Sequence, residues 1–158
     1  MLAHAEESGN SLPAHQDNCF GCGPGNGSGL GIAFTRDGDE VVGELTLDQR
    51  HEGAPGLAHG GAVSAALDEA AGSALIPHGL VAVTAQLNVA FARPVPLGRS
   101  LTVRARLARR EGRKLYIEAR LELDGHLAAS AEVLFIVVTA DHFFAHGAKP
   151  GDIPALGI

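Results

Sequence analysis

The sequence predicts an α+β domain in which a six-stranded antiparallel sheet wraps one long central helix. Apolar residues recur at helical spacing in one segment, about residues 60–76, and at a spacing of two in the strand candidates around it. Short turns join most of these strand candidates, which favours antiparallel neighbours. Because the helix and the sheet each have one apolar side, they have to bury those sides against each other.

The helix candidate begins at about Gly60 and ends near Ile76, where Pro77-His78-Gly79 stops it. Most of its core-facing positions are alanine, so strands can approach its backbone closely. These positions follow the i, i+3, i+4, i+7 pattern of a buried helix face, and they are Val63, Ala66, Leu67, Ala70, Ala71, Ala74 and Leu75.

Two strand candidates precede the helix and four follow it. The first two form a hairpin within residues 30–47, with Asp37-Gly38 as the turn signal. The last three lie within residues 99–139, with turn signals at Glu111-Gly112 and Asp124-Gly125. The candidate directly after the helix, residues 81–94, is long, and its alternation predicts one apolar face made of Val83, Ala85, Leu87, Val89 and Phe91.

The chain reads as one domain with two flanking segments. Residues 1–18 are expected to form a mobile or peripheral N-terminal arm, residues 19–140 the single domain, and residues 141–158 an irregular C-terminal tail. Inside the domain, residues 21–29 form a glycine-rich loop before the first hairpin.

The composition is typical of a globular protein that binds neither nucleic acid nor a membrane. The chain has 158 residues, of which 46% are hydrophobic and 19% charged. A net charge of −6 and an aromatic content of 4% disfavour a nucleic-acid partner. No apolar run approaches the roughly 20 residues that cross a bilayer, and the N-terminus has no signal-peptide pattern. We therefore expect a cytoplasmic protein.

The two cysteines, Cys19 and Cys22, stand in the stretch CFGCGPGNGSG. One Cys-x-x-Cys pair supplies half of a four-ligand zinc site, and the other half would have to come from histidines or a second subunit. A redox pair favours a strand-to-helix junction, whereas a glycine-rich loop follows here. We expect two structural thiols in a loop, and neither a metal nor a cofactor.

The stretch LAHGGAVSAALDEAAG, residues 57–72, places two glycines where the helix begins. The first N–H groups of a helix have no intrahelical acceptor and carry partial positive charge. Gly60 lets a ligand approach this end without a side chain in the way, and the Gly61 and Ala62 N–H groups could stabilise an anion or a developing oxyanion. The alternative is that Gly60-Gly61 permits a tight entry into the helix.

Asp68 and Glu69 lie away from the centre of the apolar stripe, on a face left for solvent or for a second subunit. Gly61 and Asp68 are about 10 Å apart along one helix, too far for one small group to touch both. Two subunits with antiparallel helices could bring Gly61 of one chain beside Asp68 of the other. Glu69 points about 100° away from Asp68, so we assign the functional carboxylate to Asp68 and no role to Glu69.

These motifs resemble the hot dog-fold acyl-CoA thioesterases of the phenylacetate-degradation and 4-hydroxybenzoyl-CoA type. The resemblance covers roughly residues 19–138 and rests on GAPGLAHGGAVSAALDEAAG followed by VTAQLNVAFARPVPLG. It implies a helix wrapped by an antiparallel sheet, homodimers that often pair into tetramers, and acyl-CoA sites at the dimer interface. CoA is then part of the substrate.

The resemblance also implies roles for particular residues. Asp68 corresponds to the catalytic carboxylate, as a base for water or as the nucleophile, and Gly61 to the backbone donor that polarises the thioester carbonyl. His59 would order the loop or position the substrate, and Thr84 would line the site with a hydroxyl. The chain departs from the pattern at Gly53, where many relatives have Asn or Gln, and His51 or Glu52 are the candidates to replace that amide.

The CoA phosphates would need basic partners. Arg93 is the better candidate because it ends the strand beside the site, whereas residues 109–114 also fit a solvated hairpin tip.

Thioester hydrolysis needs a nucleophile and an oxyanion site, and these residues supply both. Two alternatives remain open: a non-catalytic acyl-CoA sensor or interaction subunit on the same fold, and a hydratase or dehydratase that uses His51 with an acid.

Overall fold

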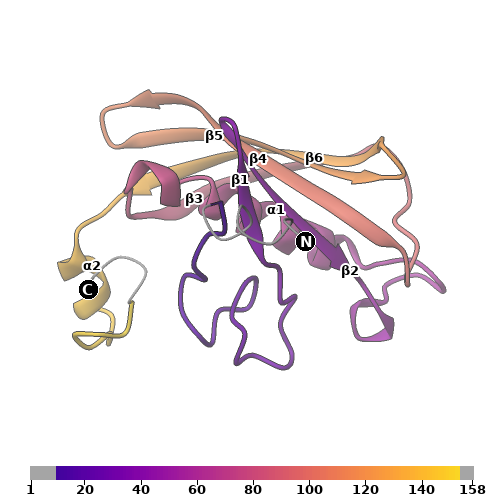
Figure 1. Ribbon diagram of the computed structural model, residues 1–158, viewed down its shortest axis with the longest axis horizontal. Helices are drawn as coiled ribbons and strands as arrows, with labels where there is room; N and C mark the ends of the chain where they lie inside the picture. The colour runs from indigo at the N-terminus through magenta and orange to yellow at the C-terminus, as the bar shows by residue number, and fades with distance from the viewer. Residues whose placement is uncertain (1–9, 154–158) are drawn as a thin grey trace, which may run out of the picture.

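A computed structural model of the protein describes residues 10–153 and contains one long helix, α1, packed against a six-stranded antiparallel sheet (Figure 1). The predicted fold class is therefore confirmed. The strand order across the sheet is β1-β2-β4-β5-β6-β3. The strands are β1 (Phe34–Asp37), β2 (Glu40–Thr46), β3 (Ala82–Phe91), β4 (Ser100–Glu111), β5 (Lys114–Leu123) and β6 (His126–Val137).

The three predicted hairpin turns are present, and each has a two-residue loop. Asp37 lies opposite Glu40, Glu111 opposite Lys114, and Leu123 opposite His126. The loop between β5 and β6 has positive φ at both residues, 52° at Asp124 and 75° at Gly125, as a type I′ turn requires.

Helix α1 (Gly60–Ser73) lies along the concave side of the sheet and supplies the middle of the core. Ala66, Leu67 and Ala70 are completely buried, so the small side chains allow the close approach that the sequence predicts. The helix ends earlier than expected. The Leu75 N–H donates to the carbonyl of Gly72, three residues earlier, as in a 3₁₀ helix. The 3₁₀ turn η3 (Ile76–His78) follows. Proline disfavours the α conformation before it, so Pro77 tightens this end.

Strand β3 is an edge strand with a β-bulge between Thr84 and Gln86, and the bulge corrects the predicted apolar face. An extra residue in a strand inverts the alternation of the side chains beyond it. Leu87 and Val89 therefore face the core as expected, but before the bulge it is Ala82 and Thr84 that face α1. Phe91, expected on the apolar face, has 55% of its surface exposed.

The flanking segments are more ordered than the sequence suggests. Residues 10–18 are attached to the domain, because Leu12 N–H donates to the Phe34 carbonyl and Ser11 bridges Thr35 on β1. The short helix α2 (Ala140–Phe144) begins the tail that was expected to be irregular. Figure 1 shows α2 beside, rather than under, the sheet. Residues 1–9 and 154–158 lie outside the described residues.

Within residues 10–153, no helix combines the length and the apolar character needed to cross a membrane.

The outer face of the sheet carries an ion-pair network centred on Glu40 at the start of β2. Its carboxylate accepts hydrogen bonds from Arg120 on β5 and Arg104 on β4. These guanidinium groups hold the pKa of Glu40 below its usual value, against the opposing effect of burial. A carboxylate with a lowered pKa in the folded state stabilises the fold above its unfolded-state pKa, and this stabilisation is lost as the pH falls.

We predict that Glu40→Gln lowers the free energy of unfolding by about 1 kcal/mol at pH 7, because one partner of a partly buried network loses its charge. Urea denaturation from pH 7 to pH 3 measures the difference. The difference in free energy of unfolding should narrow as the pH falls below ~4.3, the ordinary pKa of Glu, and vanish below the lowered pKa of Glu40, where both proteins lack the charge. Glu44→Gln, on the exposed side of the same strand, is the matched control. A difference in unfolding free energy between Glu40→Gln and wild type that does not change with pH would contradict a stabilising role for the Glu40 charge.

Candidate functional site

Asp68 and Thr84 meet between α1 and β3. The Thr84 hydroxyl donates a hydrogen bond of 2.9 Å to Asp68 Oδ1. The bulge in β3 makes this contact possible, because it turns Thr84 rather than Val83 toward the helix. Of the residues proposed from the sequence, these two are brought into direct contact.

Asp68 is half-buried beside a cavity of about 190 Å³. Burial raises the pKa of the Asp68 carboxyl, the Thr84 hydrogen bond lowers it, and the net direction is upward from the usual value. The Asp68 Oδ2 atom has no hydrogen-bond partner among residues 10–153. The cavity walls come from the N-terminal arm, α1, the segment after α1, β3 and β6, and they include His15, Gly72, Leu80 and Phe135.

The first turn of α1 is capped by His59. The Gly61 N–H donates to His59 Nδ1 at 2.8 Å, and the Ala62 N–H donates to the His59 carbonyl at 2.9 Å. In the single chain both N–H groups therefore already have an acceptor, and their expected role toward a ligand stays a prediction. An N-cap residue takes up such donors, and here the imidazole accepts the Gly61 N–H while the His59 backbone carbonyl accepts the Ala62 N–H.

A groove of about 420 Å³ lies at the same end of α1. Gly60 and Arg93 line it, together with Phe91, and a Cβ atom on Gly60 would lie 3.3 Å from the Phe91 ring. This groove and the cavity at Asp68 have no lining residue in common. Within one chain, the residues at the helix N-terminus are thus separated from Asp68 and Thr84.

Gly53, where the resemblance implies Asn or Gln in many relatives, has no room for a side chain in this structure. A Cβ atom there would lie 2.8 Å from the Cα of His59, so no side chain fits while His59 keeps its place. The Glu52 carboxylate accepts the Gly56 N–H at 2.6 Å. His51 in the 3₁₀ turn η2 (Gln49–His51) accepts the Asp48 N–H at Nδ1, at 3.1 Å. Glu52 and His51, the two candidate replacements for the missing amide, therefore both accept backbone hydrogen bonds within this loop.

His51 is also buried, with a relative exposure of 9%. Its Nε2 atom has no hydrogen-bond partner among the described residues. A buried ring whose Nδ1 already serves the backbone does not support the hydratase alternative, which needs His51 at a substrate.

The sequence reasoning missed the surroundings of Glu69. Its side chain is only 11% exposed, and Oε1 accepts a 2.8 Å hydrogen bond from His15 Nδ1. The Cys19 thiol donates to Oε2 at 3.4 Å. Glu69 is thus not a solvent-face residue, because the N-terminal arm and the glycine-rich loop fold over it. The histidine four residues before the Cys-x-x-Cys pair was the available signal.

The charges in this cluster influence one another. Burial is the largest single influence and raises the pKa of Glu69, but the hydrogen bond and charge of His15 and the two cysteine thiols together outweigh it, so the pKa lies below the usual value. Burial is the largest single influence and lowers the pKa of His15, but the Glu69 carboxylate, helped by the Gly72 backbone and Asp68, outweighs it, so the pKa lies above the usual value. Burial, reinforced by Glu69, raises the pKa of the Cys22 thiol.

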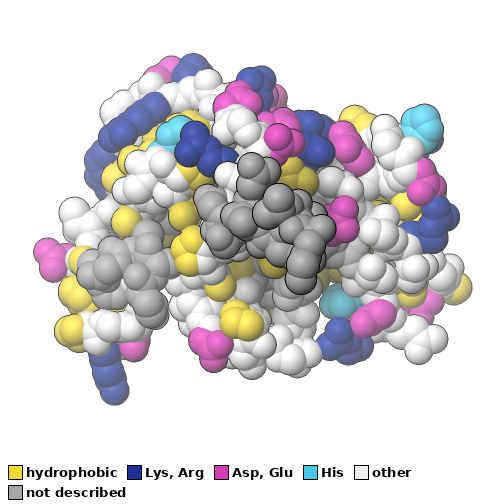
Figure 2. Space-filling view, in the orientation of Figure 1, with side chains coloured by type: hydrophobic (Ala, Val, Ile, Leu, Met, Phe, Trp, Pro, Cys, Tyr) yellow, Lys and Arg dark blue, Asp and Glu magenta, His cyan; other side chains and the backbone are white. Residues whose placement is uncertain are grey.

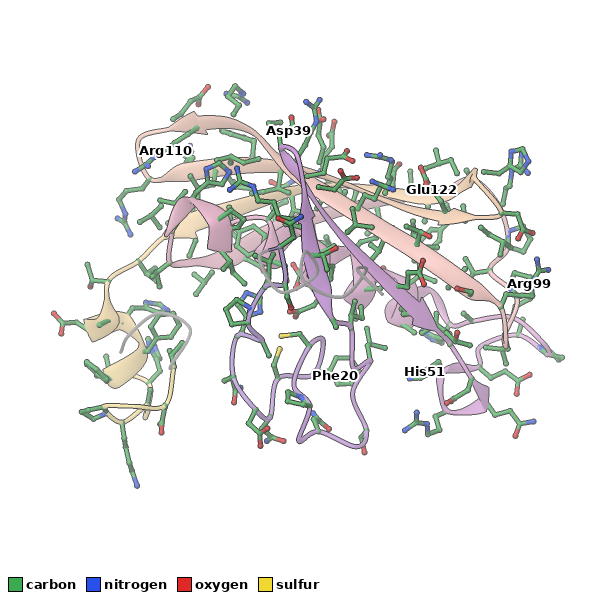
Figure 3. The ribbon with its side chains drawn as sticks, viewed as in Figure 1. Phe20, Asp39, His51, Arg99, Arg110 and Glu122 are labelled. Carbon is green, nitrogen blue, oxygen red and sulfur yellow. The ribbon has the colours of Figure 1, made fainter. Side chains whose placement is uncertain are left out.

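The basic residues of the β4–β5 hairpin form a cluster at one end of the molecule (Figures 2 and 3). They interact chiefly with the hairpin itself. Arg109 stacks 3.7 Å from the Tyr116 ring centroid and pairs with Glu111, and Arg110 donates to the Gly112 carbonyl. This arrangement favours the interpretation of a solvated hairpin tip for residues 109–114.

A helix wrapped by a six-stranded antiparallel sheet, with His-Gly-Gly at its start and Asp68 two turns later, defines a hot dog-fold protein. Residues 55–130 match the family model described as Thioesterase superfamily, so this chain is similar to that family over its central part.

Relatives and solved structures agree with this assignment. Mouse acyl-coenzyme A thioesterase THEM4 is 37% identical over 87 residues, which are 54% of this chain and 37% of the mouse protein. The chain therefore spans well under half of that relative's length. The crystal structure of the thioesterase superfamily protein RHA08564 has a TM-score of 0.69 at 34% identity, covering 72% of this chain and 60% of that one. A phenylacetic acid degradation-related protein from Ralstonia eutropha JMP134 has a TM-score of 0.63 at 26% identity, covering 68% and 86%.

We predict that His59→Ala destabilises the protein by about 1 kcal/mol, the usual cost of removing a helix N-cap. His59→Asn should recover most of the loss, because an amide oxygen can accept the Gly61 N–H. Chemical denaturation of the three proteins measures the effect. An alanine variant as stable as wild type would show that the imidazole cap contributes nothing.

Proposed function

We propose that this chain hydrolyses acyl-CoA thioesters to a free acid and CoA, in sites shared by two subunits. The observation that carries the proposal is the Asp68 carboxylate, held at one oxygen by Thr84 beside a cavity. The similarity to a protein named acyl-coenzyme A thioesterase supports this substrate class.

Asp68 supplies the attacking group in one of two ways. With Oδ1 held by Thr84, Oδ2 is free to take a proton from a water molecule that attacks the carbonyl carbon. Alternatively, Oδ2 attacks the carbonyl itself, and water then hydrolyses the resulting anhydride. Either way the carbon–sulfur bond breaks, and the CoA thiolate leaves and takes up a proton. Fixing the carboxylate matters because a weak base works only at short range.

The Gly61 N–H of the second subunit polarises the carbonyl oxygen in this proposal. In the single chain this N–H donates to His59 Nδ1. A thioester oxygen would take the place of the imidazole as acceptor, so His59 would control access to the donor. Arg93, which lines the groove at the same helix end, offers a charge to the CoA phosphates.

The edge of the sheet supports a homodimer. Strand β3 pairs with β6 on one side and has no strand on its other side within residues 10–153. Its residues are exposed or half-buried throughout, and Phe91 is an exposed aromatic ring at its end. Pairing β3 with its copy would cover this edge and bring the α1 N-terminus of one chain toward Asp68 of the other. Two such dimers could pair into a tetramer.

The test is an assay of short, long and aromatic acyl-CoAs on wild type and Asp68→Asn, with free CoA as the readout. We expect hydrolysis of some member, and at least tenfold less by the variant, because the amide is neither base nor nucleophile. Asp141→Asn, an exposed acid on α2, is the matched control. No turnover across the panel would contradict the proposal, as would full activity in Asp68→Asn.

A second function is favoured by one observation, the occupied Gly61 donor. If His59 keeps this hydrogen bond in the dimer, the site would bind acyl-CoA without polarising the thioester carbonyl. Saturable binding without turnover, unchanged in Asp68→Asn, would identify the protein as an acyl-CoA sensor or interaction subunit.

We predict that Thr84→Val lowers kcat roughly tenfold or more, because a hydrogen bond to a charged group contributes about 1.5–3 kcal/mol. Thr84→Ser should retain most of the activity, since it keeps the hydroxyl. Steady-state kinetics of both variants measure the effect. A valine variant with unchanged kcat would exclude a positioning role for Thr84.

Subunit sharing predicts complementation between two inactive variants. Gly61→Pro removes the N–H at a first-turn position where proline is tolerated, and Asp68→Asn removes the carboxylate. Mixing equal amounts by reversible unfolding should restore about a quarter of wild-type activity, since half the dimers carry one intact site. Mixing Gly61→Pro with itself is the control. If mixed dimers recover no activity, the Gly61 N–H and the Asp68 carboxylate of one site do not come from different chains.

A further inference from the structure

Four side chains with metal-binding atoms converge beneath α1, outside the catalytic residues proposed above. They are His15 from the N-terminal arm, Cys19 and Cys22 from the glycine-rich loop, and Glu69 from the helix. One ligand atom from each lies within 4.8 Å of the others. Figure 3 shows the two sulfur atoms near the labelled Phe20, on the loop that faces α1.

The spacing of these atoms fits a tetrahedral ion. Zn–S bonds of about 2.3 Å and Zn–N or Zn–O bonds of about 2.0 Å place neighbouring ligand atoms roughly 3.3–3.8 Å apart. His15 Nδ1 lies 3.4 Å from Cys22 Sγ, and Cys19 Sγ lies 3.4 Å from Glu69 Oε2. The His15–Glu69 contact is shorter, 2.8 Å, because a hydrogen bond now joins the two groups. The other pairs lie within 4.8 Å, so a small widening at this contact and a closing of the wider pairs by up to about 1 Å would complete the tetrahedron.

The loop is constructed around this cluster. A Cβ atom on Gly21 would lie 2.2 Å from Glu69 Oε2, so only glycine lets the loop pass over the carboxylate. A Cβ atom on Gly23 would lie 2.3 Å from the Cys19 nitrogen. The His15 backbone N–H donates to Cys22 Sγ at 3.2 Å. Hydrogen bonds of this kind orient a metal ligand without themselves contacting the ion.

The chemical types of these four ligands favour Zn²⁺ over Mg²⁺ and Ca²⁺. Thiolate, imidazole and carboxylate are all donors that Zn²⁺ binds, and four protein ligands are typical of its structural sites, whereas Mg²⁺ and Ca²⁺ prefer oxygen alone. His15 presents Nδ1 to the cluster while the other edge of its ring faces Gly72 of α1. All four positions are filled by the protein, and Cys22 is buried. The arrangement leaves no open position for a substrate.

We propose that His15, Cys19, Cys22 and Glu69 together bind one structural Zn²⁺ ion, which fastens the N-terminal arm and the glycine-rich loop to α1. Binding converts both thiols to thiolates and releases their protons to solvent. Cys19 and Cys22 would then be metal ligands, and not the two metal-free structural thiols that are expected from the sequence. The ion would also fix one wall of the cavity at Asp68, since His15 and Glu69 line that cavity. The proposal holds whether or not the protein is a thioesterase.

The test measures metal content in the full chain, purified with zinc and without chelator. We expect about one zinc per chain by elemental analysis. After the zinc is removed, added Co²⁺ should give thiolate-to-cobalt absorption and the intense visible bands of a tetrahedral site. Cys19→Ser and Glu69→Gln should each weaken binding at least tenfold, the usual effect of losing a ligand or its support. His126→Ala, an exposed histidine on β6, should keep its zinc.

Measurements on the wild type keep the proposal falsifiable if a variant fails to fold. A wild-type chain that binds neither Zn²⁺ nor Co²⁺ would overturn the proposal. A Cys19–Cys22 disulfide that persists when the protein is purified under reducing conditions would also overturn it. Zinc bound equally well by Cys19→Ser would place the ion elsewhere. Removal of zinc should lower the melting temperature by several degrees, because the ion binds only the folded chain. An unchanged melting temperature would refute the structural role.

Discussion

The structure depends on the close burial of a thin helix against a curved sheet. Ala66, Ala70 and Ala71 are completely buried, so the strands lie near the backbone of α1. Little of the helix then remains for solvent, and each polar side chain on it needs a partner. Asp68 finds Thr84 on β3, and Glu69 finds His15 and Cys19 on the N-terminal segment. Both candidate sites arise from this one constraint.

Two irregular features make those pairings possible. The bulge in β3 turns Thr84 toward α1, and Gly21 lets the glycine-rich loop pass directly over Glu69. A regular strand would present Val83 at that place, and any side chain at position 21 would displace the carboxylate. Bulges and glycines at close approaches are frequent next to functional sites for this reason.

The two sites share a wall. His15 and Glu69 line the cavity that holds Asp68, so the position of the N-terminal arm shapes the surroundings of the proposed catalytic carboxylate. At the other end of the helix, His59 occupies the Gly61 donor, and the groove beside it opens toward the free edge of β3. A single chain therefore presents two partial sites, and a second copy could join them.

The sequence by itself determined the fold class, the hairpin turns at Gly38, Gly112 and Gly125, and the buried face of α1, because periodicity and turn chemistry are local properties. That Asp68 and Thr84 belong to one site followed only from the family resemblance, and their hydrogen bond was not predicted, since its geometry needs the bulge. Tertiary structure alone decided that His59 caps Gly61 and that Glu69 is buried. Positions 15, 19, 22 and 69 are distant along the chain, and no local pattern says that the arm folds back onto α1.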